Sequence, residues 1–162
     1  MLFRQRDTAM HNVPLNKEVL QARLSYVEDS LKSLERFTGV AFEEFRSNQD
    51  NFRIAFYDLR RALEAVMDIG SHILSRIPGA RASSYKEISK LLGKHKIVPL
   101  DFADNQLSKM AGYRNRMTHF YSQITEKELY DIIQRDLGDF ELFCKHISDL
   151  LKDPSKRGFT TE

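Results

Sequence analysis

Apolar residues recur at intervals of three and four along most of the chain, which is the period of an amphipathic helix rather than of a strand. Over residues 15–37 this pattern predicts a first long helix, and over 50–76 it predicts a second, ended by a Pro-Gly pair. Gly70 lies within the apolar stripe of the second helix, so we interpret it as a point where another helix approaches closely. The apolar seam of the first helix consists of Leu20, Leu24, Val27, Leu31 and Leu34.

Two capping-box sequences mark helix starts in the second half of the chain. Ser84-Tyr85-Lys86-Glu87 predicts a short helix closed by Gly93, and Thr125-Glu126-Lys127-Glu128 predicts a final helix over 126–152. Between them, a helix is expected to begin at Pro99 or Leu100 and to reach the neighbourhood of Tyr121.

The predicted fold class is therefore all-α: an antiparallel bundle of four long helices with one or two short helices. The expected organisation is an N-terminal arm over 1–14, a single helical domain over 15–152 and a flexible C-terminal tail over 153–162.

The composition limits the functions and the cellular compartment to be expected for this bundle. With 25 Lys and Arg against 23 Asp and Glu, the formal net charge is +2, which excludes a polybasic nucleic-acid scaffold. Cys144 is the single cysteine, so an internal disulfide is impossible and a reducing compartment is indicated. The sequence has neither an apolar run of about 20 residues nor an apolar leader at its start, so we expect a cytoplasmic protein without a membrane segment.

The sequence gives no support for a metal or a cofactor. Its five histidines include no H-E-x-x-H pair, one cysteine cannot build a zinc knuckle, and neither a P-loop nor a dinucleotide fingerprint is present. Glu64 and Asp68 lie one turn apart, but no Glu-x-x-His accompanies them, which makes a bundle di-metal site improbable. We therefore expect no metal site and no cofactor.

The most unusual stretch is 109–121, which gathers polar, basic and aromatic residues near the end of a predicted helix. On a helix, Arg114 shares a face with Tyr121, and Asn115 shares the neighbouring face with His119. Arg114 and His119 lie about 140° apart around an ideal helix. They act on one ligand only if the ligand is large, the helix end unwinds, or a second chain contributes.

Residues of these types suit the cleavage of a phosphodiester. Arg114 offers a fixed fork of donors to phosphate, and histidine is the side chain best suited to move a proton near neutral pH, a role open to His119. Asn115 can hold the histidine tautomer, and no metal is required when RNA supplies its own 2′-hydroxyl nucleophile. The alternative is that arginine and histidine merely satisfy the last carbonyls of a helix.

Residues 114–121 match the R-x-x-x-x-H-x-Y signature of HepT-like toxins, a branch of the HEPN superfamily. The helix over 52–70 and the segment 84–88 resemble the family in their order, and the resemblance covers roughly 15–151. It implies the toxin of a type VII-like toxin–antitoxin system: a metal-independent endoribonuclease that acts on RNA as a homodimer, with a composite cleft between two signature helices.

The resemblance also implies roles for single residues. Arg114 and His119 take the catalytic positions, Asn115 supports them, and Tyr121 takes the position to which an MntA-like nucleotidyltransferase antitoxin attaches AMP. A two-fold axis would place two arginines and two histidines around one phosphate.

Further residues have more than one interpretation. Arg60 and Glu64 form an i,i+4 pair, which supports the helix surface, buttresses the signature helix or adds charge to the cleft. The alternative for the whole chain is a non-catalytic HEPN module that docks to a nucleotidyltransferase or presents substrate to it; a helical dimerisation domain is a third. Lys109, Tyr113 and Arg116 either extend an RNA-binding rim or form a solvated helix face. Arg53 matches a family position and is a further candidate for binding RNA.

Overall fold

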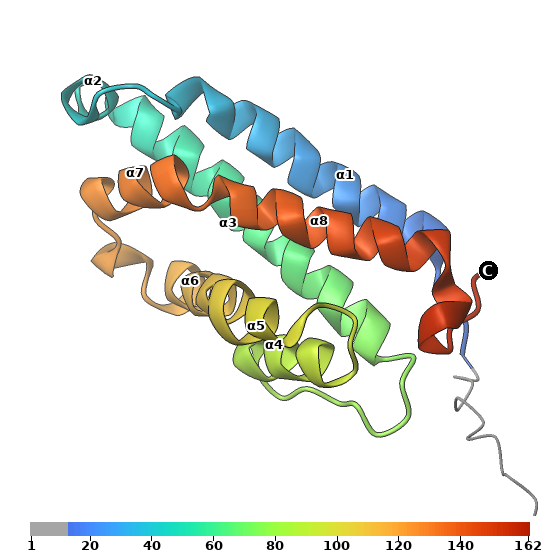
Figure 1. Ribbon diagram of the computed structural model, residues 1–162. Coiled ribbons are helices and arrows are strands. Elements are labelled where there is room, and N and C mark those ends of the chain that lie inside the picture. The colour runs from blue at the N-terminus through green and yellow to red at the C-terminus, as the bar shows by residue number, and fades with distance from the viewer. Residues whose placement is uncertain (1–12) are drawn as a thin grey trace, which may run out of the picture.

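The computed structural model describes residues 13–162, and this part of the chain is built from helices (Figure 1). The α-helices are α1 (Lys17–Leu34), α2 (Phe42–Arg46), α3 (Gln49–Leu74), α4 (Tyr85–Lys94), α5 (Leu100–Phe102), α6 (Ser108–His119), α7 (Glu126–Arg135) and α8 (Leu137–Lys152). Short turns of 3₁₀-helix are η1 (Glu35–Phe37), η3 (Tyr121–Gln123) and η4 (Pro154–Arg157), and η2 (Ala103–Leu107) is a turn of π-helix. The all-α prediction is confirmed.

The long helices form one bundle. Figure 1 shows α1, α3 and α8 lying along one another, with α4 and α6 packed on the other side of α3. The seam predicted for α1 is buried throughout, and the core continues through α3 and α8. Side-chain caps begin four of the helices, and they are Asn16, Asn48, Ser84 and Thr125.

Gly70 is the contact point between α3 and α4. A Cβ atom at this position would lie 2.6 Å from Ile88 Cγ2 and 3.0 Å from Leu92 Cδ1. Only glycine lets the two helices approach this closely. The interpretation of Gly70 from the sequence is confirmed, and this contact fixes where the N-terminus of α4 lies relative to α3.

The predicted final helix is in fact two helices, α7 and α8, separated at Asp136. The backbone at Asp136 has φ −111° and ψ 0°, and its buried carboxylate accepts hydrogen bonds from Lys109 and Tyr113 of α6. The prediction of one continuous helix over 126–152 was wrong because these bonds hold Asp136 against α6.

The run from Leu100 to His119 begins where the sequence predicted but contains the π-turn η2. The carbonyl of Asp101 accepts a hydrogen bond from Asn105 Nδ2 at 2.8 Å within this turn. α4 continues one residue past the expected stop at Gly93, where a Cβ atom would lie 2.6 Å from Ala103 Cβ. The glycine therefore serves a close contact between α4 and the π-turn.

The C-terminal segment is packed, in contrast to the expected flexible tail. Phe159 is buried, and Leu15 pairs with the segment through hydrogen bonds to Thr160 and Glu162, of 2.8 and 3.0 Å. The segment is held by the burial of the Phe159 side chain and by hydrogen bonds to the Leu15 backbone. Neither contact can be predicted from the polar composition of the segment itself. Most of the expected arm, 1–12, lies outside the described residues. None of the helices of residues 13–162 is long and apolar enough to cross a membrane.

Candidate active site on helix α6

Helix α6 presents two different environments along its length. One face packs against α3 and α4, and its buried residues are Met110, Ala111 and Met117. Arg114 lies on the packed side, whereas Asn115 and His119 are exposed. The angular separation of Arg114 and His119 expected on a helix is therefore present in the fold.

Arg114 is held between α3 and α4. Its Nη2 atom lies 3.1 Å from Glu64 Oε1, its guanidinium carbon lies 5.1 Å from the centre of the Tyr85 ring, and the side chain is 11% exposed. The Nε and Nη1 atoms are buried without a hydrogen-bond partner. A guanidinium has five N–H donors, so this arrangement leaves donors that a phosphate oxygen would satisfy.

Glu64 joins two arginines. Its Oε1 atom lies 3.4 Å from Arg60 Nε as well as 3.1 Å from Arg114 Nη2. The i,i+4 pair with Arg60 follows from the sequence, and the second contact makes Glu64 a buttress of α6, which is one of the interpretations of this pair. Sequence reasoning missed Tyr85, since nothing in its local pattern indicates that the first residue of α4 faces α6.

The other half of the signature is open to solvent. His119 is the last residue of α6, where the Phe120 amide donates to the Arg116 carbonyl, and Tyr121, in η3, is 65% exposed. The helix thus ends two residues before Tyr121, because Phe120 adopts φ −132° and ψ 34°. The shared helical face expected for Arg114 and Tyr121 is not formed.

Three of the four suggested rim residues are tied to neighbouring helices. Arg116 makes a two-pronged ion pair with Glu128 of α7, with Nη2 to Oε2 at 2.9 Å, and Lys109 Nζ lies 3.2 Å from Asp136 Oδ2. The Tyr113 hydroxyl donates to the same carboxylate at 3.2 Å. In the single chain these side chains brace α6 against α7 and α8.

The protonation of these bracing groups agrees with their contacts. Burial raises the pKa of Tyr113, and the Asp136 carboxylate raises it further, so the hydroxyl remains a donor. For Lys109 burial is the largest single influence and lowers the pKa, but the hydrogen bonds to Asp136 and Tyr113 and the charges of these two groups together outweigh it, so the pKa is raised. Hydrogen bonds to Glu128 raise the pKa of Arg116.

The fourth rim residue, Arg53, stands apart from this cluster. Its side chain is 76% exposed, and its nearest carboxylate is that of Asp50, 4.0 Å away. An exposed pair at this distance contributes little to stability. Arg53 is therefore free to meet a ligand, and its contact with RNA stays a prediction, as it does for the other three residues.

An all-α bundle with this signature helix defines a HEPN-like protein. The family model described as Ribonuclease HepT-like matches residues 27–147. The chain belongs to the HepT-like ribonuclease family, which confirms the resemblance drawn from the signature.

Curated relatives agree with this assignment. The chain is 26% identical over 133 residues to the tRNA nuclease HepT of Aphanizomenon flos-aquae, covering 82% of this chain and 90% of that protein. It is 25% identical over 128 residues to the mRNA nuclease HepT of Shewanella oneidensis, covering 78% and 93% of the two chains.

Solved structures share the fold. The tri-AMPylated HEPN toxin of Shewanella oneidensis, in complex with its MNT antitoxin, superposes with a TM-score of 0.73 at 22% identity, covering 82% of this chain and 98% of that one. YutE of Bacillus subtilis, a cytosolic protein of unknown function, gives a TM-score of 0.74 at 18% identity, covering 92% and 99%. At these identities the likeness establishes the HEPN-like fold.

Proposed function

We propose that this chain is the toxin of a toxin–antitoxin pair and a metal-independent endoribonuclease whose active site forms between two copies of the chain. One observation carries the proposal: in a chain of a ribonuclease family, α6 presents an exposed His119 at its end and holds Arg114 with two guanidinium nitrogens that have no hydrogen-bond partner. The relatives named tRNA and mRNA nuclease support an RNA substrate.

The proposed reaction uses the RNA 2′-hydroxyl as nucleophile. Its oxygen bonds to phosphorus while the bond from phosphorus to the 5′-oxygen breaks, leaving a cyclic 2′,3′-phosphate and a 5′-hydroxyl. One His119 accepts the proton of the 2′-hydroxyl, and His119 of the second copy donates a proton to the departing oxygen. Arg114 stabilises the negative charge on the pentavalent phosphorus, and Asn115 supports the histidine.

Arg114 must become accessible for this reaction. Its Nε and Nη1 atoms are covered in the single chain, so a phosphate reaches them only if the arginine or the Tyr85 ring shifts. Each buried donor without a partner costs about 1–3 kcal/mol, which favours such a shift once a phosphate is present. During this shift the ion pair with Glu64 of α3 keeps the guanidinium on the side of α6 that faces α3.

Tyr121 is the proposed site of neutralisation by a nucleotidyltransferase antitoxin. Its exposure makes the hydroxyl accessible to another enzyme, and Phe120 beside it is 47% exposed and offers an apolar contact. AMP on Tyr121 would place a negative charge two residues from His119, where it competes with RNA for the imidazole. The AMPylated HEPN toxin among the solved structures supports the modification.

Digestion of a labelled RNA set in EDTA tests the nuclease. The wild type is expected to cleave, and Arg114→Ala and His119→Ala are each expected to lose at least a hundredfold in kcat, as for a general acid or base. Arg135→Ala, at an exposed arginine in the last turn of α7, is the control for loss of one positive charge. Wild-type protein that neither cleaves RNA nor arrests growth would instead favour the docking module.

Co-expression with a nucleotidyltransferase encoded beside this chain tests the modification separately. The mass of the tryptic peptide that holds Tyr121 is expected to rise by one or more AMP units. Tyr121→Phe is expected to stay unmodified and toxic. Neutralisation with an unchanged mass at Tyr121 contradicts the AMP proposal while leaving the nuclease intact.

A further inference from the structure

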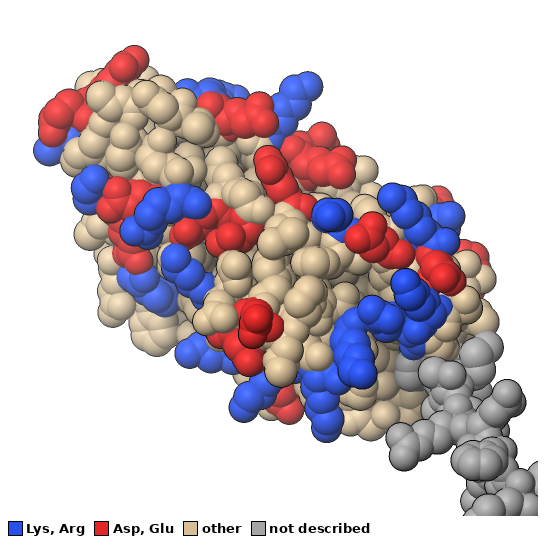
Figure 2. All heavy atoms as spheres, in the orientation of Figure 1, with Lys and Arg blue, Asp and Glu red and all other residues tan. Residues whose placement is uncertain are grey.

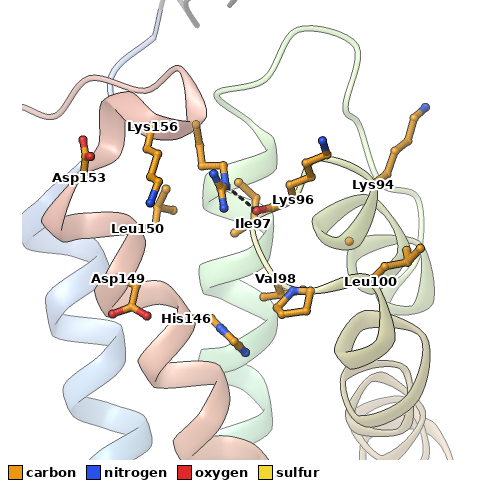
Figure 3. Close-up of a pocket in the computed structure, with 13 residues that line it drawn as sticks. Lys94, Lys96, Ile97, Val98, Leu100, His146, Asp149, Leu150, Asp153 and Lys156 are labelled. Atoms are coloured by element: carbon orange, nitrogen blue, oxygen red, sulfur yellow. Dashed lines mark hydrogen bonds between the residues drawn. The ribbon is translucent and has the colours of Figure 1, made fainter.

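A cavity of about 530 Å³ lies far from the signature end of α6. It opens between the loop that joins α4 to α5 and the end of α8 with η4 (Figure 3). Leu100, on its wall, begins the helical run that ends at His119, and 20 helical residues span about 30 Å. The cavity is therefore separate from the proposed active site.

Positive charge gathers around this cavity. Four cations line it, against the two carboxylates of Asp149 and Asp153, which gives a formal charge of 4 − 2 = +2, the net charge of the whole chain. The cations are Lys94, Lys96, Lys156 and Arg157. Figure 2 shows Lys and Arg side chains gathered on this face, whereas elsewhere on it charges of both signs alternate.

The lysines of the cavity are free to bind an anion. Within residues 13–162, the side chains of Lys94, Lys96 and Lys156 make no hydrogen bond or ion pair. Figure 3 shows Lys156 extending from η4 along one wall and Lys96 on the opposite wall, while the Lys94 side chain extends outward from the rim. An anion seated between the two walls would meet cations from both.

The backbone of Lys96 is unusual. It has φ 59°, the only positive φ at a residue other than glycine in the described part of the chain. The left-handed region costs an ordinary residue about 1–2 kcal/mol, so glycine would be the more stable choice here. Arg157 Nε donates to the Lys96 carbonyl at 2.7 Å and holds the loop in this conformation. The Lys96 amide donates to the Gly93 carbonyl at 3.1 Å and the Ile97 amide donates to the Leu92 carbonyl at 2.9 Å, so the left-handed residue closes α4 and places Lys96 on the cavity wall.

The floor of the cavity is apolar. Ile97 and Val98 are buried beneath it, Leu100 is an exposed apolar side chain at its edge, and His146 lies at its base (Figure 3). Burial lowers the pKa of His146, and the uncharged imidazole offers a flat surface at neutral pH. A volume of this size accommodates a nucleotide.

We propose that this cavity is a second RNA-binding site, in which one base rests on the apolar floor beside His146 while Lys96, Lys156 and Arg157 hold the flanking phosphates. The nearly neutral charge of the chain excludes broad electrostatic attraction to RNA, so substrate affinity requires a local site of this kind. The identity of RNA as the ligand rests on the proposed nuclease function. An exosite at this end of α6 lets the enzyme grip RNA beyond the cleaved bond.

Binding of a labelled single-stranded RNA to His119→Ala protein at several salt concentrations tests the proposal without cleavage. For single strands, each phosphate contact contributes about 0.7 to the slope of log K against log salt. Lys96→Gly and Lys156→Ala are each expected to reduce the slope by about that amount and to weaken binding several-fold at low salt. Lys32→Ala, an exposed lysine of α1, is the matched control and is expected to change neither.

The glycine variant separates binding from folding. Because glycine suits φ 59°, Lys96→Gly is expected to keep or raise the thermal midpoint while it loses RNA affinity. With His119 intact, the same variants are expected to raise KM and to leave kcat unchanged.

Three results would decide against the site or separate it from the nuclease. An unchanged salt slope and affinity in the Lys96→Gly, Lys156→Ala double variant overturns the exosite. Loss of binding to the nucleotidyltransferase with intact RNA binding assigns the cavity to a protein partner and overturns it too. Loss of RNA binding in a protein whose wild type never cleaves RNA supports the exosite and contradicts only the nuclease.

Discussion

The two halves of the signature in α6 differ in almost every physical respect. The Arg114 half is packed between α3 and α4, tied to Glu64 and covered by Tyr85. The half that holds His119 and Tyr121 is exposed, and the chain leaves the helix between these two residues. Within one eight-residue motif, Arg114 therefore belongs to the interior of the bundle, whereas His119 and Tyr121 belong to its surface.

This difference explains why one copy of the chain is an incomplete catalyst under our proposal. The bundle sets the position of Arg114 through its contacts with Glu64 of α3 and Tyr85 of α4. His119 and Tyr121 depend on no such packing and are presented outward to a second copy, to RNA or to a modifying enzyme. Perturbing the packing around Arg114 is thus expected to change stability, while changes at His119 alter activity alone.

The largest change in stability is expected from the contact that positions α4. Gly70→Ala would push a methyl group into Ile88 and Leu92, displacing α4 and with it Tyr85. Overpacking costs about 1–3 kcal/mol, opposed by the better helix propensity of alanine. We expect a net loss in the free energy of unfolding, measured by urea denaturation.

Gly112→Ala in α6 is the matched control. Apart from its chain neighbours and the backbone of α6 itself, no atom lies within 4 Å of a Cβ at Gly112, so alanine is expected to stabilise the protein by about 0.5–1 kcal/mol through helix propensity alone. If both variants shift the urea midpoint equally, the close approach at Gly70 does not position α4.

A smaller effect is expected at Glu64. Glu64→Ala removes the acceptor of Arg114 Nη2 and leaves a third nitrogen of the guanidinium without a partner. The half-exposed carboxylate makes this worth about 1 kcal/mol, and Glu64→Gln should retain part of it because its amide oxygen still accepts. The free energy of unfolding from chemical denaturation measures both variants.

Arg60→Ala supplies the comparison for Glu64, because it removes the other partner of Glu64 and leaves the contact with Arg114. We expect it to change the unfolding free energy by no more than a few tenths of a kcal/mol, as for an i,i+4 surface pair. An Arg60→Ala loss equal to that of Glu64→Ala would show that the surface pair, and not the buttress of α6, accounts for the effect.

Local patterns predicted what depends on local interactions. The seam of α1, the caps at Ser84 and Thr125, and the close approach at Gly70 follow from spacing within one element and from single-residue chemistry. The family signature also predicted the ribonuclease family that the comparisons establish.

What the sequence missed depends on contacts between distant segments. The break at Asp136 is fixed by Lys109 and Tyr113, which lie 27 and 23 residues away, and the buried Phe159 belongs to a segment that pairs with Leu15. The burial of Arg114 requires α3 and α4 to converge on α6. None of these contacts leaves a periodic signal in the segment concerned.

The most direct test of the central claim is cleavage by mixed dimers. Arg114→Ala and His119→Ala chains with different tags are co-expressed, the doubly tagged species is purified, and its cleavage of labelled RNA is measured in EDTA. A site shared between the two copies keeps one arginine and one histidine in the mixed dimer, whereas each single-variant dimer lacks one of these residue types entirely. The mixed dimer is therefore expected to cleave faster than either variant alone, but more slowly than the wild type because one of the two histidines is missing. A mixed dimer no faster than the two single variants would contradict an active site shared between two copies.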